Sequence, residues 1–430
     1  MSDLPRAPRR RTVARHARLS SPSPFGQLAT LLAIALAVVL VSGASTAAFY
    51  AWNAVETAAA SGVDIGEGEQ QLPPTIGEYE GGVNLLIVGT DSCEGQDLAL
   101  FPRCRHDQGG ERNDVTMLVH IGDDPRRVTV VSFPRDMLVP VPQCPDGEGG
   151  YYSAMSSPMM NATYVYGGLP CTVLTIEALT GINVDFAAAI RWTGVINMSD
   201  AIGGVQVCVA EDIRDRHTGL SLKAGTPTLK GVQALQFLRI RHGIGDGSDL
   251  SRISNQQQFM SSMVRKLQSE EVLSNPVTLF NLANTAIQQM NDRQLTLSNG
   301  LTNPTRMVQI AMAVKDVPFS DITFIQYPTG YVQDGDGNRV VPLRDAADVL
   351  FTALGDNRPI RITGKTSPGA SNSQEVKGEI QPTPQPTATP GATASPTDAP
   401  TATPVDAVEL PSVITGQTAN QVTCTLRERG

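Results

Sequence analysis

The feature that most constrains this chain is a segment without any charged residue, which runs from Leu19 to Val55. Within it, Leu28–Trp52 supplies 25 mostly apolar residues, and a helix that crosses a bilayer needs about 20. Six arginines precede this segment, which favours a cytoplasmic N-terminus. We therefore expect a single-pass membrane protein with a basic cytoplasmic arm over 1–27 and the remainder of the chain outside the cytoplasm.

A cleaved signal peptide is the competing interpretation. Leu28–Val41 has the length of a signal-peptide apolar region, and small residues follow it. Apolar residues continue past Ala47 to Trp52, which favours an uncleaved anchor. Under either interpretation, the chain beyond about residue 55 lies on the outer side of the membrane.

The formal net charge of −9 is divided unevenly along the chain. Residues 1–24 carry six arginines and one acid, so the remainder holds 27 basic and 41 acidic residues. An acidic body outside the cytoplasm is not the charge distribution of a nucleic-acid-binding protein. Hydrophobic residues make up 41% of the chain, which is enough for a sizeable core.

Six cysteines fit an oxidising compartment, where disulfides persist. No CxxC pair is present and no histidine lies at ligand spacing to these cysteines, so a zinc site is disfavoured. Sequence alone leaves the pairing open, although two pairs of neighbours would close local loops. The disulfide candidates are Cys93 and Cys104, Cys144 and Cys171, and then Cys208 and Cys424.

The C-terminal region is dominated by a low-complexity segment, Pro382–Pro404, which holds seven prolines and seven threonines. Such a segment cannot bury a core, so we expect a disordered, semi-extended spacer over 362–408. In the last residues, Glu409–Val413 and Gly416 resemble the opening of a PASTA repeat, with a helix expected from Thr418. The alternative is a disordered tail that carries one cysteine.

Residues 83–361 alternate strands with helical stretches, which predicts an α/β layered domain. Leu235–Arg241 alternates apolar and polar residues, and a Gly-rich turn and a helix follow it. The expected strands are Val83–Val88, Val115–Ile121, Val128–Phe133 and Val205–Val209, and the expected helices are Thr172–Leu179 and Ser248–Leu267.

Several arginines lie at the expected strand and helix ends, each with acids nearby. Any one of them alone is explained by an exposed salt bridge. Together they indicate an anion site, because the planar guanidinium binds phosphate in a bidentate manner and several suit a pyrophosphate. Acidic residues that converge on such a site repel each other unless a cation lies between them. Because Mg2+ binds carboxylate oxygens beside substrate phosphates, it is the cation that these residues suggest. The residues concerned are Arg112, Asp114, Arg135, Asp136, Arg239, Arg241, Asp249, Arg252 and Gln256, the last three on one face of a helix.

The motifs in this region resemble the LytR–CpsA–Psr family of membrane-anchored cell-wall phosphotransferases. Seven blocks occur in the family's order over about 175 residues, which makes the resemblance specific. They are NLLIVGTD (84–91), RNDVTMLV (112–119), VSFPRDMLVPVP (131–142), NATYVYGG (161–168), TGINVDFAAAI (180–190), DAIGGVQV (200–207) and ALQFLRIRHGIGDGSDLSRISNQQQF (234–259).

The resemblance implies an α/β/α sandwich on a mixed central sheet, with an apolar tunnel for a polyprenyl chain. It also implies transfer of a glycopolymer from a polyprenyl-pyrophosphate carrier to a peptidoglycan hydroxyl as a phosphodiester. The polymer stays open between teichoic acid, arabinogalactan, capsule and glycoprotein glycan. The implied organisation is a cytoplasmic arm (1–27), a transmembrane helix (28–52), a linker (53–82), a catalytic domain (83–361) with its motifs in 84–259, a spacer (362–408) and a tail (409–430).

The resemblance also assigns roles to individual residues. Asp91 and Asp114 match the family's magnesium-binding aspartates and, with Arg135, form the expected catalytic group. Asp136 is expected to orient the neighbouring arginines. The residues expected at the pyrophosphate are Arg112, Arg135, Arg239, Arg241, Asp249, Arg252 and Gln256.

Two departures from the family pattern affect this site. Met159 stands where many members carry Lys or Arg, so one cationic contact is lost or comes from elsewhere, with His242 as one source. A polar insert that holds Cys93 and Cys104 separates Asp91 from the next block. This insert either reshapes the acceptor side of the site or is a disulfide-pinned surface loop without a catalytic role.

Two other functions fit the same residues. A polyprenyl-pyrophosphate or nucleotide phosphohydrolase would use water in place of the sugar hydroxyl. A non-catalytic wall-binding or regulatory membrane protein is supported only by the spacer and the PASTA-like fragment. The joint presence of six charged residues weighs against a non-catalytic protein; they are Asp91, Asp114, Arg135, Arg239, Arg241 and Arg252.

Overall fold

The computed structural model describes residues 23–66, 79–107, 110–245, 247–268, 272, 276–332, 339–364, 373–376 and 407–427. The chain divides into two units, Met1–Ala54 and Val55–Gly430. Helix α1 (Pro24–Ala60) contains an apolar stretch, Phe25–Gly43, that is long enough to cross a membrane. It is compatible with a single-pass anchor, although a signal sequence has the same composition. Most of the expected basic arm lies outside the described residues.

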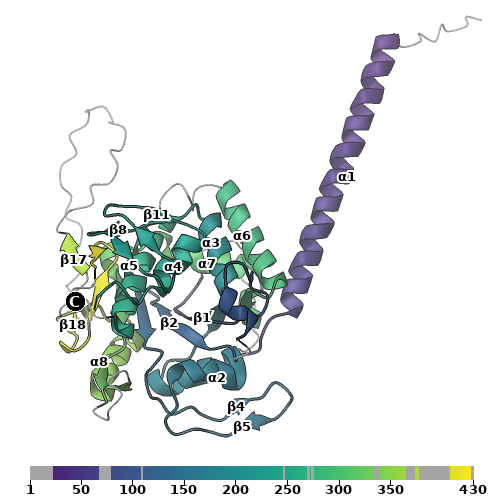
Figure 1. Cartoon of the computed structure of the whole chain (residues 1–430). Helices are drawn as coiled ribbons and strands as arrows, with labels where there is room; N and C mark the ends of the chain where they lie inside the picture. The colour runs from purple at the N-terminus through teal and green to yellow at the C-terminus, as the bar shows by residue number, and fades with distance from the viewer. Residues whose placement is uncertain are drawn as a thin grey trace, which may run out of the picture. The chain divides into compact units, whose positions relative to one another are not determined.

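The second unit is built on a seven-stranded mixed sheet (Figure 1). Two neighbouring pairs, β1 with β6 and β3 with β13, are parallel, and the other pairs are antiparallel. This confirms the mixed central sheet that the family resemblance implies. The strand order is β12 (Leu295–Leu297), β6 (Phe186–Ile190), β1 (Val83–Thr90), β2 (Asn113–Ile121), β3 (Val128–Phe133), β13 (Ile322–Gln326) and β19 (Gly416–Thr418).

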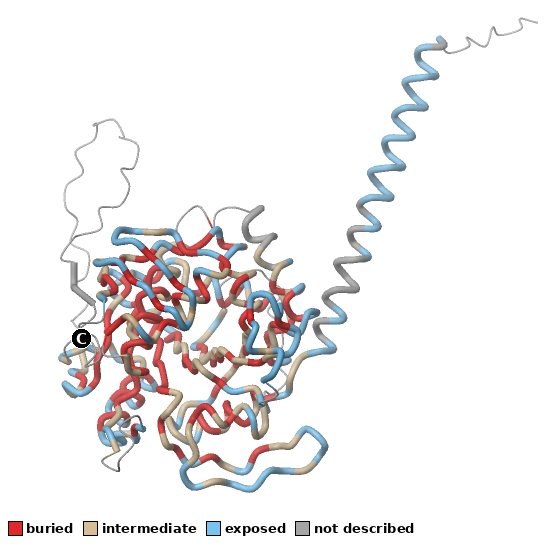
Figure 2. Tube along the Cα trace, in the orientation of Figure 1, coloured by how far each residue is buried: buried red, intermediate tan, exposed pale blue. Residues whose placement is uncertain are grey.

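Both faces of the sheet are covered, as near-continuous apolar strands require. Leu86 and Val88 belong to one core cluster, whereas Leu85 and Ile87 pack against another, because alternate residues of a strand point to opposite faces. β3 is buried along its length, and Figure 2 shows the buried residues gathered in the interior of the α/β domain. Helices α2 (Thr163–Thr180) and α8 (Arg344–Gly355) contribute to the first cluster, and α6 (Pro276–Asn291) and α7 (Pro304–Lys315) contribute to the second.

The remaining elements pack around this sandwich. Helices α4 (Val232–Arg239) and α5 (Asp249–Gln268) contribute to a third apolar cluster, and α3 (Trp192–Ala201) contributes to a small fourth one. The short 3-10 helices are η1 (Pro102–Arg105), η2 (Met160–Ala162), η3 (Asn299–Leu301) and η4 (Phe319–Asp321). The short strands are β4 (Cys144–Pro145), β5 (Tyr151–Tyr152), β7 (Val205–Gln206), β8 (Cys208–Val209), β9 (Ile213–Arg214), β10 (Ser221–Leu222), β11 (Thr228–Leu229), β14 (Thr329–Tyr331), β15 (Val340–Pro342), β16 (Ile360–Arg361), β17 (Ser373–Val376), β18 (Val408–Glu409) and β20 (Val422–Thr425).

Two segments differ from what their sequence pattern indicated. The first residues of the alternating segment Leu235–Arg241, which was not assigned to an element, belong to helix α4, and this helix buries Leu235 and Phe237 on one side. The expected strand Val205–Val209 forms the two short strands β7 and β8, which pair outside the central sheet with β11 and β20. In both places tertiary packing decides the conformation of a short apolar run.

The C-terminal segment 407–427 also differs from expectation. It is neither a separate tail nor a helix from Thr418, because β19 pairs with β13 and forms the edge of the central sheet. Leu410 and Ile414 are fully buried in the first core cluster. These contacts place the segment within the α/β domain, which therefore does not end at Arg361. The Pro382–Pro404 spacer lies outside the described residues.

All six cysteines are paired in three disulfides. Cys93 is bonded to Cys104 and Cys144 to Cys171, which are the two local loops noted in the sequence. The third bond joins Cys208 to Cys424 across 216 residues. It attaches β8 to β20 and so ties the C-terminal segment to the body of the domain.

Candidate active site

The strand register brings the acidic and basic candidates to one edge of the sheet. Asp91 directly follows β1, whose last residue, Thr90, is paired with Asn113 at the start of β2. β3 is paired with the same part of β2 and ends just before Pro134 and Arg135. The end of β1, the start of β2 and the end of β3 therefore meet at one edge of the sheet.

A β-bulge lies at the centre of this edge. Gly89 pairs with Val115 and Thr90 pairs with Asn113, so Asp114 is left out of the ladder. A bulge re-aims the side chain of the extra residue and leaves its backbone groups unpaired. The free carbonyl oxygen of Asp114 accepts a hydrogen bond from Arg252 Nη2 at 2.9 Å.

Arg135 joins the acids of this site. Its Nη1 donates to Asp114 Oδ1 at 2.7 Å, and its Nε lies 3.5 Å from Asp136 Oδ2 and 3.6 Å from Asp249 Oδ1. Burial alone would lower the pKa of Arg135, but the three carboxylates outweigh burial and raise it. Burial would likewise raise the pKa of Asp114, yet Arg252 and Arg135 hold it below its usual value. Both groups are therefore charged.

Asp249 and Arg252 form a buried pair on the first turn of α5. Arg252 Nη2 lies 2.5 Å from Asp249 Oδ1, and the two side chains are only 7% and 8% exposed. Both carboxylate oxygens of Asp249 are buried without a hydrogen bond, so the arginines compensate their charge through ion pairing. The spacing of three residues seen in the sequence accounts for this pair.

Asp91 lies on the other side of the bulge. Its Oδ1 accepts a hydrogen bond from the backbone N–H of Arg112 at 2.8 Å, and Arg103 Nη2 lies 3.6 Å from its Oδ2. Burial and, to a smaller extent, repulsion by Asp114 raise its pKa despite that backbone hydrogen bond. The two aspartates are therefore close enough to interact, and a cation between them would relieve their repulsion.

Arg239 forms no ion pair with a carboxylate among the described residues. Its guanidinium carbon lies 4.2 Å from the ring centroid of Trp192, a cation–π contact. Burial lowers the pKa of Arg239, and repulsion by Arg103 adds to that effect, although Asp114 and Asp91 oppose it. A half-buried arginine with this environment is suited to binding an anion from solution.

The remaining predicted residues occupy supporting positions. Gln256 Nε2 donates to the carbonyl oxygen of Leu238 at 3.0 Å, so this side chain holds the end of α4 rather than pointing into the site. Arg241 Nε donates to the carbonyl oxygen of Gly247 at 3.1 Å, and Arg241 lines a small pocket together with Asp136 and Asp249. Arg112 is exposed at the rim.

Sequence reasoning missed Arg103 and Trp192. Arg103 comes from the insert and contacts both Asp91 and the Trp192 ring. His242, considered as the replacement cation for Met159, is exposed and stacks on His217, with ring centroids 4.3 Å apart. The adjacent cysteines were the signal that the insert is held in a defined conformation.

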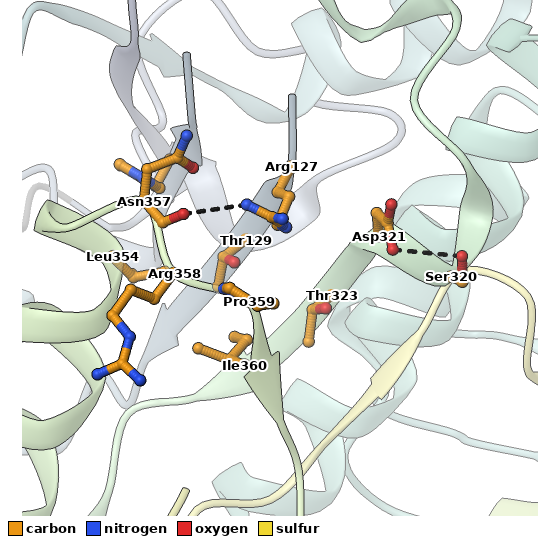
Figure 3. Close-up of a pocket in the computed structure, with 11 residues that line it drawn as sticks. Arg127, Thr129, Ser320, Asp321, Thr323, Leu354, Asn357, Arg358, Pro359 and Ile360 are labelled. Atoms are coloured by element: carbon orange, nitrogen blue, oxygen red, sulfur yellow. Dashed lines mark hydrogen bonds between the residues drawn. The ribbon is translucent and has the colours of Figure 1, made fainter. Parts of the chain in front are cut away.

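A second pocket lies away from these residues (Figure 3). His120, at the end of β2, and Thr129, at the start of β3, contribute to its wall. These positions are at the opposite ends of their strands from Asp114 and Arg135. Arg127 there donates to the backbone carbonyl of Asn357 at 3.0 Å. This pocket is therefore separate from the candidate active site.

A mixed sheet covered on both faces, with arginines and aspartates gathered at one edge, defines an α/β protein with a charged site at the ends of its strands. The chain belongs to the LytR_cpsA_psr family, whose sequence model matches residues 48–350. This confirms the resemblance noted in the motifs.

Individual relatives support the same assignment. The chain is 26% identical over 368 residues to the cell wall biosynthesis protein LcpA of Corynebacterium glutamicum, which covers 80% of this chain and 68% of that protein. It is 28% identical over 244 residues to the polyisoprenyl-teichoic acid–peptidoglycan teichoic acid transferase TagT of Bacillus subtilis, with 54% and 69% covered. Among solved structures, the LytR-Csp2A-Psr enzyme from Actinomyces oris has a TM-score of 0.50 and 26% identity, with 69% and 95% covered.

Proposed function

We propose that this protein is a membrane-anchored phosphotransferase of cell-wall assembly. It transfers a glycopolymer from a polyprenyl-pyrophosphate carrier to a hydroxyl group of peptidoglycan and forms a phosphodiester. Helix α1 anchors it with the N-terminus in the cytoplasm and the α/β domain outside. Family membership and the names of LcpA and TagT, which refer to cell-wall biosynthesis and teichoic acid transfer, support this class of reaction.

The observation that carries the proposal is the set of arginines around one aspartate pair. Arg135 and Arg252 contact Asp114 through its side chain and its carbonyl, and Arg239 lies nearby without an acidic partner among the described residues. Guanidinium groups held by protein contacts are pre-organised donors for a pyrophosphate and for charge that develops as its bond breaks. Phosphoryl transfer depends mainly on such positioning and charge neutralisation.

The residues present also fit a bound Mg2+ ion. Asp91 and Asp114 offer carboxylate oxygens, the ligand type that Mg2+ prefers, and each contributes one of the two carboxylates that such sites commonly use beside substrate phosphates. Within the described part of the chain, no group of three or more acidic, histidine or cysteine side chains is arranged to hold a metal. We assign the ion to the pair Asp91 and Asp114 because these carboxylates repel each other, and a cation there would relieve this repulsion and neutralise phosphate charge.

The proposed reaction forms one bond to phosphorus, breaks another and transfers one proton. The acceptor hydroxyl oxygen forms a bond to the phosphorus that carries the glycopolymer, and the bond from that phosphorus to the bridging oxygen of the pyrophosphate breaks. Polyprenyl phosphate leaves, and Arg135 and Arg252 stabilise its growing charge. The hydroxyl proton passes to the carboxylate of Asp91 or Asp114, directly or through water.

The proposal is tested with the full-length protein in detergent, labelled polyprenyl-pyrophosphate-linked glycan, peptidoglycan fragments and Mg2+. The expected product is glycan covalently joined to the muropeptide. We expect Arg135→Ala to slow transfer by about 10²- to 10³-fold, the usual effect of removing one positioned donor. Arg361→Ala is the matched control, because Arg361 is exposed and forms a surface ion pair with Glu409.

Two results would contradict the proposal. Free glycan phosphate without any joined product would indicate a polyprenyl-pyrophosphate phosphohydrolase, in which water replaces the sugar hydroxyl. An unchanged transfer rate in Arg135→Ala would mean that the reaction occurs elsewhere in the protein.

A further inference from the structure

The insert after Asp91, defined here as residues 92–111, is packed onto the domain. Gln96 is only 7% exposed; its Nε2 donates to Gln294 Oε1 at 2.8 Å, and its Oε1 accepts from Thr193 Oγ1 at 2.7 Å. Phe101 stacks against Trp192, with ring centroids 4.8 Å apart. An insert that only covered the surface would not need these buried contacts.

A disulfide fixes the part of the insert that faces the site. Cys93, two residues after Asp91, is bonded to Cys104, which packs in the same small apolar cluster as Phe101 and Trp192. Arg103 immediately precedes Cys104 on the 3-10 helix η1. The bond therefore limits where the Arg103 side chain can reach.

Arg103 shares one indole ring with Arg239. The guanidinium carbon of Arg103 lies 4.4 Å from the ring centroid of Trp192. The guanidinium carbon of Arg239 lies 4.2 Å from the same centroid. Trp192 itself is only 3% exposed. Two guanidinium groups held around one ring repel each other, and this repulsion contributes to the lowered pKa of Arg239.

An anion that contacts both guanidinium groups would relieve this repulsion. The side chain of Arg103 is 47% exposed, so one side of it is open to a ligand, whereas its ion pair with Asp91, at 3.6 Å, is long. Arg103 thus differs from Arg135 and Arg252, each of which donates a hydrogen bond to Asp114.

We propose that Arg103 is a substrate-binding residue which, together with Arg239, contacts the diphosphate of the donor, and that the Cys93–Cys104 disulfide holds it in place. The identity of the anion rests on the proposed function, whereas the convergence of the two arginines on Trp192 does not. The insert therefore forms one wall of the active site.

The test measures binding of geranylgeranyl pyrophosphate, a polyprenyl diphosphate without glycan, to the full-length protein in detergent with Mg2+ by titration calorimetry. We expect Arg103→Ala to raise the Kd about tenfold and Arg103→Lys to raise it less, because Lys keeps the charge but loses the planar fork. Arg105→Ala is the matched control: Arg105 lies on the same 3-10 helix and is exposed, and its loss should change the Kd less than twofold.

A second comparison separates substrate contact from a structural effect. In a Cys93→Ser/Cys104→Ser background, Arg103→Ala should add little further loss of affinity, because the arginine is no longer held in place. Arg103→Ala should also raise the KM for the lipid-linked donor more than it lowers kcat, with an unchanged unfolding temperature.

The outcomes distinguish this inference from the proposed function. Equal Kd values for Arg103→Ala and Arg105→Ala would overturn the inference even if glycan transfer occurs. Diphosphate binding that depends on Arg103, without transfer to peptidoglycan, would support the inference and overturn the proposed function. Absence of diphosphate binding by the unmodified protein would overturn the inference.

Discussion

Arg252 Nη2 donates a hydrogen bond of 2.9 Å to the carbonyl oxygen of Asp114, across 138 residues of sequence. The same nitrogen lies 2.5 Å from the buried carboxylate of Asp249. One guanidinium thus joins the first turn of α5 to the bulge in β2. Because a bulge leaves a carbonyl without a partner in the sheet, Arg252 completes the edge that carries both aspartates.

This relationship predicts a large stability effect for Arg252→Met. Removing one partner of a buried ion pair leaves an uncompensated charge, so we expect a loss of about 3–5 kcal/mol in the free energy of unfolding. Urea denaturation followed by circular dichroism measures it. Arg361→Met, which breaks an exposed pair with Glu409, is the control and should leave the midpoint nearly unchanged. The additional substitution Asp249→Leu should restore part of the loss; a midpoint unchanged by Arg252→Met would contradict the buried pairing.

The two aspartates should differ in their response to magnesium. If Asp91 and Asp114 share the ion, Asp91→Asn and Asp114→Asn both lower the transfer rate by about 100-fold or more, because each removes charge from the site. Asp91→Asn should be partly rescued by higher Mg2+ concentration. Asp114→Asn should not, since Asp114 also holds Arg135 through a hydrogen bond. A magnesium titration of the rate measures this. Asp212→Asn, on the exposed surface, is the control; full activity in both site variants would exclude the pair as the metal site.

The sequence predicted the strand ends of this site well. β1, β2 and β3 are long apolar runs with clear ends, so Arg112, Asp114 and Arg135 were expected at strand ends of one anion site. The spacing of Asp249 and Arg252 on one helix was also sufficient to predict their contact.

Other parts of the site could not be predicted in this way. The bulge at Asp114 depends on the register between two strands and leaves no pattern in either one. The meeting of Arg103, Trp192 and Arg239 joins three distant segments. β19 is a short polar strand, Gly416–Thr418, which is specified by the open edge of β13 rather than by its own residues.

The Cys208–Cys424 disulfide should contribute more to stability than the local Cys93–Cys104 bond. In the chain-entropy description, a disulfide stabilises the fold by restricting the conformations of the unfolded chain. The stabilisation increases with the number of residues in the loop that the disulfide closes. The two bonds close 216 and 11 residues. Cys208→Ser/Cys424→Ser should therefore lose about 5 kcal/mol and Cys93→Ser/Cys104→Ser about 3 kcal/mol. Thermal unfolding of both variants measures the order, and an equal or reversed order would show that strain or residual structure outweighs loop entropy.

His120, which lies away from the candidate active site, leads us to predict how the stability of the protein changes with pH. Its ring is partly buried, and its Nδ1 lies 2.8 Å from Asn84 Oδ1. Burial lowers its pKa below the ordinary 6.5, although a backbone hydrogen bond opposes this. At a pH between the lowered pKa and 6.5, the unfolded chain binds more protons at this histidine than the folded protein does. The contribution of neutral His120 to the free energy of unfolding is therefore present above pH 6.5 and is lost as the pH falls below that value.

His120→Gln should remove this part of the pH dependence. We expect urea midpoints of the unmodified protein to fall from pH 7.5 to pH 5.5 more steeply than those of the variant, because Gln has no proton to gain. His106→Gln, at an exposed position, is the control and should keep the steeper slope. If His120→Gln and the unmodified protein have parallel slopes, His120 is not the group whose protonation opposes folding in this pH range.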